Sequence, residues 1–208
     1  MPFGEPVDIP TLRLDEAERQ RASRYLREED RIRFAVTRST LRHLLGRYLD
    51  VNPLALEFVT TRHGRPELAS LSGPMFNVSH AGEHALIAIS REFDVGIDVE
   101  FVNAAIDWRE LAALVCTLDE QRLLDMAPRG LQNSHFFQCW TAKEALLKAL
   151  GVGIAEGLQA ISVVPGAVGS QSPFVRDGSE FAKARSLTFH WIMDIPGYMA
   201  CIAHGRCG

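Results

Sequence analysis

The sequence has no long hydrophobic run and no surplus of positive charge. Its apolar stretches fall short of the roughly 18–20 residues that a membrane-spanning helix needs, and no basic segment followed by an apolar one opens the chain. The formal net charge of −4 over 208 residues argues against general nucleic-acid binding. We therefore expect a cytoplasmic protein with no nucleic-acid partner, no membrane association and no signal peptide.

Cysteine and lysine are also scarce. The cysteines lack the CxxC spacing of metal sites, so we expect reduced, mostly buried thiols; they are Cys116, Cys139, Cys201 and Cys207. Lysine occurs only at 143, 148 and 183, although arginine is used almost everywhere else. A lysine can release its proton when its surroundings demand it, whereas an arginine cannot. A compact ammonium at position 148 is therefore suggestive of a chemical role.

The composition is that of an ordinary globular protein. Hydrophobic residues make up 47% of the chain and charged residues 23%, enough for one large domain or two small ones. Helical periodicity and strand-like apolar runs alternate in blocks along the chain. The expected helices are 15–27, 30–49, 104–115, 117–127 and 134–150, and the expected strands are 57–61, 75–79, 84–90, 95–100, 160–164, 187–193 and 198–203.

The order of these elements, helices then strands in each of two blocks, favours an α+β fold. Residues 75–100 have the pattern of a three-stranded meander, and residues 165–186, rich in Gly, Ser and Pro, are expected to form a loop. The helix 30–49 has one apolar face and one face rich in arginine. The runs 82–90 and 197–204 both begin with glycine and continue with small and aliphatic residues, a faint sign of internal duplication.

Two short segments carry the chemistry. Residues 95–100 read VGIDVE, so Asp98 and Glu100 leave the same face of a strand while the valines and isoleucine fill the other face. Residues 140–148 read WTAKEALLK, and Glu144 and Lys148 are four apart on one face of a helix. Three carboxylates and one ammonium can thus be presented from two rigid elements.

The carboxylates Asp98, Glu100 and Glu144 need a cation if they converge. Two unit charges ~4 Å apart interact by about 4 kcal/mol at an effective dielectric near 20. Oxygen ligands suit Mg²⁺ or Mn²⁺ rather than Zn²⁺, and Mg²⁺ usually completes its shell with waters and substrate phosphates. Lys148 would face the same phosphates. The two segments predict a metal site for phosphoryl transfer.

Each segment by itself also has a purely structural explanation. An Asp-x-Glu pair on a strand is common without a metal. A glutamate four residues before a lysine is the favoured orientation of a helix-stabilising ion pair, worth roughly 0.2–0.5 kcal/mol. The combination is more specific, because Glu144 follows Asp98 by 46 positions.

Together with residues 77–82, NVSHAG, the two segments resemble the 4′-phosphopantetheinyl transferases, in the branch typified by the activator of surfactin synthetase. That family has a (V/I)-G-(I/V)-D block. Some forty residues later come an aromatic and a small residue followed by x-K-E-(A/S)-x-x-K. Residues 77–82 match its N-(I/V)-S-H-(S/A)-G block. The blocks occur in the family's order, and the resemblance extends from about Arg19 to the C-terminal strands.

The resemblance implies an architecture and a reaction. It implies two similar α/β halves related by a pseudo-twofold axis, here 1–93 and 94–208, with coenzyme A and the active site at their interface. The implied reaction moves the 4′-phosphopantetheine group of coenzyme A to a serine of an acyl or peptidyl carrier protein and releases adenosine 3′,5′-bisphosphate. The reaction would depend on Mg²⁺, with Mn²⁺ as an alternative. The implied enzyme is a transferase of the holo-acyl-carrier-protein synthase type. Two halves that complete one site favour a monomer.

The resemblance also implies roles for single residues. Asp98 and Glu100 would be metal ligands. Glu144 would be a metal ligand, the general base toward the carrier serine, or both, and Lys148 would neutralise the leaving phosphate and donate a proton to it. The matches to coenzyme A contacts are Arg21, Arg33, Arg65, Ser79 and His80, with His80 on the 3′-phosphate.

Some matches depart from the family or have two explanations. Arg65 stands where the family's GKP element has lysine, and Glu18 stands where a lysine is frequent. Lys143 is either a solvated or carrier-facing lysine or a phosphate contact. Glu120 either completes a capping box with Thr117 or lies near the site. Trp140 is expected to anchor its helix in the core.

Two other functions stay open beside the transferase. A non-catalytic module binding coenzyme A or a carrier would not need the intact charged set Asp98, Glu100, Glu144 and Lys148. A metal-dependent phosphoester hydrolase would leave NVSHAG and the missing histidine ligands unexplained. Spacing does not reveal whether the carrier serves fatty acid, polyketide, nonribosomal peptide or siderophore synthesis.

Overall fold

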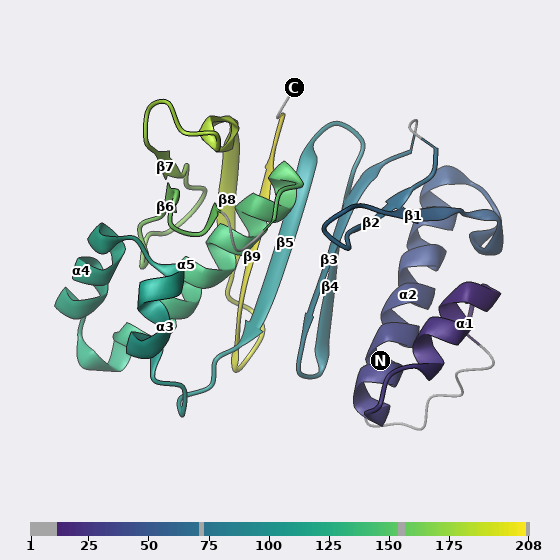
Figure 1. The fold of residues 1–208 in the computed structure, drawn as a ribbon, viewed down its shortest axis with the longest axis horizontal. Coiled ribbons are helices and arrows are strands. Elements are labelled where there is room, and N and C mark those ends of the chain that lie inside the picture. Colours follow the sequence, from purple (N-terminus) through teal and green to yellow (C-terminus); the bar gives the residue numbers. More distant parts are fainter. Residues whose placement is uncertain (1–11, 71–72, 154–156, 207–208) are drawn as a thin grey trace. The chain divides into compact units, whose positions relative to one another are not determined.

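The computed structural model describes residues 12–70, 73–153 and 157–206. Contacts divide the chain into two compact units, Met1–Pro74 and Met75–Gly208. Both contain helices and short antiparallel strand pairs (Figure 1). This architecture confirms the α+β prediction, while the expected pseudo-twofold halves stay a prediction.

The first unit is built on two helices. Its elements are α1 (Glu16–Ser23), α2 (Glu28–Leu49), the 3₁₀ helix η2 (Pro53–Ala55) and the antiparallel strands β1 (Phe58–Thr60) and β2 (Pro66–Leu68). Asp15 caps α1, and its side chain and that of Glu18 satisfy each other's backbone N–H groups in a capping box. Glu18, which stands in the place of a family lysine, therefore has a structural role.

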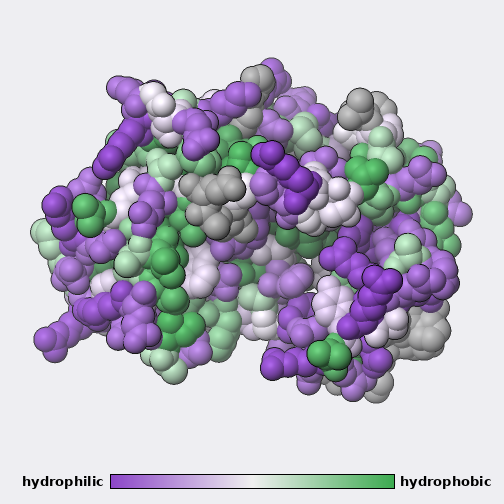
Figure 2. All heavy atoms as spheres, viewed as in Figure 1, coloured by the Kyte–Doolittle hydropathy of each residue, from purple (hydrophilic) through white to green (hydrophobic). Residues whose placement is uncertain are grey.

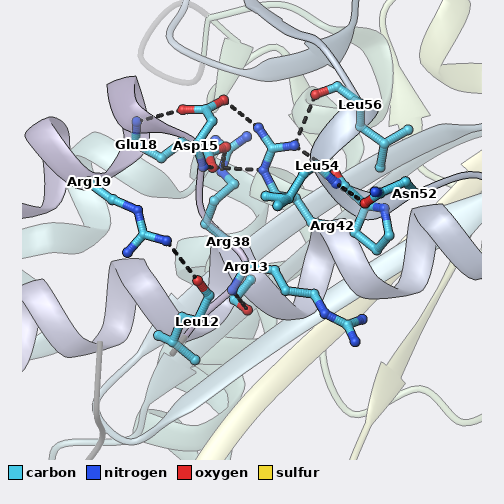
Figure 3. Close-up of polar contacts among 12 residues, drawn as sticks. Leu12, Arg13, Asp15, Glu18, Arg19, Arg38, Arg42, Asn52, Leu54 and Leu56 are labelled. Carbon is cyan, nitrogen blue, oxygen red and sulfur yellow. Dashed lines mark hydrogen bonds and ion pairs between the residues drawn. The ribbon is translucent and has the colours of Figure 1, made fainter. Parts of the chain in front are cut away.

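Arg42 of α2 lies in the interior of this unit, although helical spacing placed it on the arginine-rich face. Its Nε donates to Glu18 Oε2 at 2.7 Å and its Nη2 to Asp15 Oδ2 at 2.5 Å, and Nη1 donates to the carbonyls of Pro53 and Leu56 (Figure 3). Burial of the guanidinium is tolerated because each of its three nitrogens donates to at least one acceptor. The pattern of polar residues alone could not indicate this burial.

In residues 75–153 and 157–206 the second unit has a hairpin, a three-stranded sheet and the helices α3, α4 and α5. The hairpin pairs β3 (Met75–Ala81) with β4 (His84–Ser90), and the sheet has the order β5 (Asp94–Phe101), β9 (Tyr198–Gly205), β8 (Leu187–Ile192), all antiparallel. The helices are α3 (Trp108–Val115), α4 (Leu118–Met126) and α5 (Arg129–Leu150). The remaining elements are the antiparallel pair β6 (Ile161–Ser162) and β7 (Phe174–Val175) and the 3₁₀ helix η3 (Ala182–Ser186).

Helix α5 packs across the sheet formed by β5, β9 and β8 (Figure 1). The core between them is apolar; α5 contributes Phe136, Phe137, Leu146 and Leu147, and β9 contributes Met199, Cys201 and Ala203. Cys116 and Cys139 are also buried, which fits the expected core thiols, whereas Cys207 lies outside the described residues.

Gly96 allows α5 to approach β5 closely. A Cβ atom at this position would overlap the backbone of Ala145 and Ala149 in α5. Glycine inside a strand marks close approach of another backbone, and here that backbone is the helix carrying Glu144 and Lys148. The neighbouring side chains Val95 and Ile97 are buried in a separate apolar cluster with Ala88 of β4.

The structure differs from the sequence-based expectations in several elements. The meander over 75–100 is wrong, because β5 pairs with β9 rather than with β4. Helix α5 begins at Arg129, earlier than the expected start at residue 134. Gly130 does not interrupt it, because this glycine lies in the first turn, where N–H groups lack intrahelical partners in any case. The expected loop 165–186 contains β7 and η3.

Two helix boundaries coincide with local capping signals. Thr117 and Glu120 form the capping box of α4, and Gly151 ends α5 with a left-handed φ of 70°.

No helix within the described residues is both long and apolar enough to span a bilayer. Figure 2 shows hydrophobic residues gathered over the region where α3 lies in Figure 1; Leu114 at the end of α3 and Leu118 at the start of α4 are exposed.

Candidate active site

The structure brings the carboxylates of Asp98, Glu100 and Glu144 together. One oxygen from each lies within 4.8 Å of the others, although they come from β5 and α5. Asp98 and Glu100 share the face of β5 that Gly96 presents to α5, as the alternation of a strand requires. The juxtaposition expected from the two segments is therefore present within the second unit.

Lys148 lies among these carboxylates. Its Nζ is 2.5 Å from Asp98 Oδ1 and 3.3 Å from Glu144 Oε2, the partner one helical turn before it. Burial alone would lower the pKa of Lys148, but the charges of Asp98 and Glu144 raise it above its usual value. Lys148 therefore stays protonated and neutralises part of the acidic cluster.

The NVSH segment on β3 holds β5 through its side chains. Asn77 Oδ1 accepts from the backbone N–H of Ile97 at 2.9 Å, and Ser79 Oγ accepts from that of Val99 at 3.4 Å. The Ser79 hydroxyl also donates to Asp98 Oδ1 at 2.8 Å. In the described part of the chain, side chains rather than a backbone ladder join β3 to β5. Ser79 thus orients the most buried carboxylate of the site.

Burial perturbs the two carboxylates on β5. Asp98 is only 1% exposed, and burial raises its pKa to about 6 although Lys148 and Ser79 act in the opposite direction. Burial, with added repulsion from Asp98 and Glu144, raises the pKa of Glu100 to about 7. Both groups would gain from a cation that stabilises their charged forms.

Glu144 is held by an aromatic side chain on its own helix. The indole Nε1 of Trp140 donates to Glu144 Oε1 at 2.6 Å, so one oxygen is engaged by Trp140 and the other faces Lys148. The Trp140 ring packs parallel to Phe137 and edge-on to Phe136, which fixes the donor. Trp140 thus contacts a site residue as well as the core. Its four-residue spacing to Glu144 could have indicated this contact.

The residues present fit a hard divalent cation. Asp98 Oδ2 is buried and has no hydrogen-bond partner among the described residues, so a carboxylate oxygen remains available for a ligand. The candidate donors are all carboxylate oxygens, which favours Mg²⁺ or Mn²⁺. A metal role for Asp98, Glu100 and Glu144 stays a prediction, supported by this donor set.

Lys143 is neither solvated nor available to phosphate, so both expectations for it are wrong. It is fully buried, forms an ion pair with Glu120, and donates to the carbonyl of Val115 at 2.7 Å. Glu120 in turn accepts from the N–H groups of Thr117 and Val163. The pair connects α4, α5 and the ends of α3 and β6. Only contacts between distant segments reveal this structural role.

The residues matched to coenzyme A contacts fall in both units. Arg21 lies over the ring of Phe34, and Arg33 pairs with Asp30; both belong to the first unit. Arg65 also lies in the first unit, just before β2, whereas Ser79 and His80 are on β3 in the second unit. His80 is exposed at the strand end and Ser79 is buried. The binding role of these five residues stays a prediction.

Two residues that position the site were not assigned a role from the sequence. Asn77 lies in the NVSHAG block and Gly96 in the VGIDVE segment, but the motifs by themselves assign no role to either residue. Both had a recognisable signal. Asn77 alternates with Ser79 along β3, and a glycine inside an apolar strand indicates close backbone approach.

Comparison with known proteins gives consistent matches. Residues 94–203 match the family model of the 4′-phosphopantetheinyl transferase superfamily, and residues 5–92 match that of the 4′-phosphopantetheinyl transferase N-terminal region. A putative 4′-phosphopantetheinyl transferase, slr0495, from Synechocystis sp. is 36% identical over 163 residues, which cover 75% of this chain and 66% of that protein.

Two further relatives carry the same description. The 4′-phosphopantetheinyl transferase HetI from Nostoc sp. is 37% identical over 161 residues, covering 73% of this chain and 68% of HetI. The 4′-phosphopantetheinyl transferase psf-1 from Bacillus pumilus is 30% identical over 122 residues, covering 59% and 51%. The matched segments thus span about two thirds or less of the length of these three relatives.

Proposed function

Since this chain belongs to the 4′-phosphopantetheinyl transferase superfamily, we propose that it transfers the 4′-phosphopantetheine group of coenzyme A to a carrier protein. The acceptor would be a serine hydroxyl of an acyl or peptidyl carrier, and adenosine 3′,5′-bisphosphate would be released. The observation that carries the proposal is the convergence of Asp98, Glu100 and Glu144 beside Lys148.

Asp98, Glu100 and Glu144 would hold Mg²⁺ or Mn²⁺ in this proposal. The bound ion would neutralise the diphosphate of coenzyme A. Asp98 is the best positioned of the three, because Ser79 fixes one oxygen and the other has no hydrogen-bond partner among the described residues. Since a single chain supplies all the charged groups, the proposal needs only a monomer.

Lys148 and Glu144 would act on the reacting groups. The serine oxygen forms a bond to the phosphorus next to pantetheine, and the bond from that phosphorus to the bridging oxygen breaks. Lys148 is protonated and partly exposed, so it can neutralise or protonate the leaving phosphate. Glu144 would accept the serine proton directly or through water, or share in binding the ion.

Resemblance to the family is the basis for assigning single residues to coenzyme A. We assign Arg21, Arg33 and Arg65 to its phosphates by resemblance, and His80 to its 3′-phosphate. The exposure of His80 supports this role. The Ser79 hydroxyl already contacts Asp98 and the N–H of Val99, which supports a role in positioning Asp98 rather than in direct contact with the nucleotide.

A transfer assay tests the proposal and separates it from the alternatives. The protein is mixed with coenzyme A, Mg²⁺ and a panel of apo-carrier proteins, and the carriers are weighed by mass spectrometry. We expect one carrier or more to gain the phosphopantetheine mass. Binding of coenzyme A without a mass gain would indicate a binding module, and loss of coenzyme A without a carrier would indicate a hydrolase.

Removal of any one carboxylate should nearly abolish transfer. Loss of a residue that hydrogen-bonds to a metal ligand typically lowers activity by roughly 10–100-fold. We expect Asp98→Ala, Glu100→Ala and Glu144→Ala each to lower kcat/KM by more than that, because they remove a ligand itself. Circular dichroism and thermal unfolding check that the variants fold. Wild-type turnover by a folded variant would remove that residue from the proposed ligand set.

A further inference from the structure

The ammonium of Lys148 lies against the carboxylate of Asp98. Its Nζ is 2.5 Å from Asp98 Oδ1, 3.3 Å from Ser79 Oγ and 3.3 Å from Glu144 Oε2. Asp98 and Glu144 are two of the three carboxylates whose oxygens lie within 4.8 Å of one another. Lys148 therefore occupies the electrostatic position that a divalent ion would also require.

A bound divalent ion and Lys148 cannot both stay at this position at low cost. An Mg²⁺ ion lies about 2.1 Å from its ligand oxygens. With Nζ 2.5 Å from Asp98 Oδ1, an ion on that oxygen would be roughly 5 Å or less from the ammonium, and an ion on Oδ2 would be roughly 7 Å or less from it. Charges of the same sign at that separation repel in a site with little water. One of the two must move, and Ser79 and Trp140 hold the carboxylates of Asp98 and Glu144 in place.

Lys148 is the group that can move. Asp98 is 1% exposed and tied to Ser79, whereas the Lys148 side chain is 18% exposed on a flexible four-carbon stem. Asp98 Oδ1 would keep the Ser79 hydroxyl as a donor after the ammonium left, and Val99 N–H keeps that hydroxyl in place. The contacts on β3 and β5 therefore survive the departure of Lys148.

We propose that Lys148 is an exchangeable counter-ion. It neutralises Asp98 and Glu144 in the chain without a divalent ion, and entry of the ion moves its ammonium from Asp98 to a position where it can meet a phosphate. Delivery to the diphosphate of coenzyme A rests on the proposed function, whereas the exchange itself does not. The lysine thereby weakens ion binding in the absence of substrate and couples the ion to the substrate phosphate.

Titration with Mg²⁺ alone tests the competition. Calorimetry compares the wild type with Lys148→Met and with Lys183→Met, which removes the same charge from an exposed lysine in η3. We expect Lys148→Met to bind Mg²⁺ at least about tenfold more tightly and Lys183→Met to stay within about twofold of the wild type. Equal, weaker or undetectable binding by Lys148→Met would overturn the proposal.

Lysine side-chain NMR tests the exchange in the unmodified chain. The sequence has only three lysines, so the Nζ signals can be assigned with the two single variants. We expect saturating Mg²⁺ to shift the Lys148 signal, while Lys143, buried against Glu120, serves as an internal reference that does not shift. An unchanged Lys148 signal at saturation would refute the exchange.

The outcomes separate this proposal from the proposed function. A shifted Lys148 signal with no transfer to any carrier would leave the exchange standing and contradict the transferase. Efficient transfer with an unshifted Lys148 signal would support the transferase and contradict the exchange.

Discussion

Asp98 and Glu100 are acidic residues in surroundings that disfavour their charges. Their pKa values are raised to about 6 and about 7, with burial as the leading cause. The folded chain therefore binds more protons than the unfolded chain between about pH 4 and pH 7. Stability from these two groups is greatest below their unfolded pKa values and is lost as the pH rises through that window. Lys148 titrates only at alkaline pH and does not oppose this trend.

The pH dependence of unfolding follows from that sign. Without divalent ions, the free energy of unfolding of the wild type should fall between pH 5 and pH 8. The fall should be smaller in Asp98→Asn/Glu100→Gln, because the amides cannot ionise. Mg²⁺ at pH 8 should restore wild-type stability, and its binding should release protons below about pH 7. Urea unfolding at both pH values measures the difference. Identical pH profiles for wild type and variant would contradict the raised pKa values.

Trp140 is a positioning residue for Glu144. Trp140→Phe keeps an aromatic ring but removes the Nε1 donor that is 2.6 Å from Glu144 Oε1. A hydrogen bond to a charged group contributes about 1.5–3 kcal/mol, so we expect kcat to fall by about tenfold or more. Because the lost donor positions Glu144 and does not contact the proposed coenzyme A residues, the KM for coenzyme A should change by less than about twofold.

Trp191→Phe is the matched control for this change. Its Nε1 donates to the backbone carbonyl of Gln138 at 3.0 Å and contacts none of the three carboxylates. We expect this variant to lose a comparable hydrogen bond while its kcat stays within about twofold of the wild type. Equal effects of both variants on kcat would show that Trp140 acts only through packing.

At the scale of elements, the contact between β5 and α5 decides whether the site exists. The strand supplies Asp98 and Glu100, the helix supplies Glu144 and Lys148, and Gly96 lets their backbones touch. Asn77 and Ser79 of β3 secure the other edge of β5 through side-chain hydrogen bonds. The site thus depends on packing distances that a single methyl group would change.

Gly96→Ala should separate β5 from α5. The added Cβ would meet backbone atoms of Ala145 and Ala149, which cannot rotate away as a side chain could. We expect a loss of about 3 kcal/mol or more in the free energy of unfolding, at the upper end of overpacking costs. Urea denaturation monitored by fluorescence measures it. Gly130→Ala is the control, because its Cβ would meet nothing within 4 Å and alanine favours a helix by up to about 1 kcal/mol.

At the scale of the whole molecule, the Lys143–Glu120 pair ties distant parts of the second unit together. Lys143→Met would leave Glu120 buried and charged, and loss of one partner of a buried pair costs about 3–5 kcal/mol. The exposed pair Arg122–Asp119 provides the control, since Arg122→Ala should cost at most about 1 kcal/mol. Thermal unfolding of both variants measures the contrast, and equal losses would contradict the structural role of Lys143.

Much of the fold and the site was predictable because the signals are local. The caps at Thr117 and Gly151 and the strand 84–90 follow from neighbouring residues. The shared faces of Asp98 with Glu100 and of Glu144 with Lys148 follow from the strand and helix periods. Contacts between distant segments were not predictable in this way. Periodicity could not show that β5 pairs with β9, that Arg42 and Lys143 are buried, or that Ser79 donates to Asp98.

The sequence by itself determined which groups could act, because side-chain chemistry and the strand and helix periods are properties of short segments. Only the tertiary structure decided that the three carboxylates meet and that the ammonium of Lys148 reaches Asp98. The physical reason is that both outcomes depend on how closely α5 packs on β5. That distance is set by a missing side chain at Gly96 and by contacts far apart in the chain.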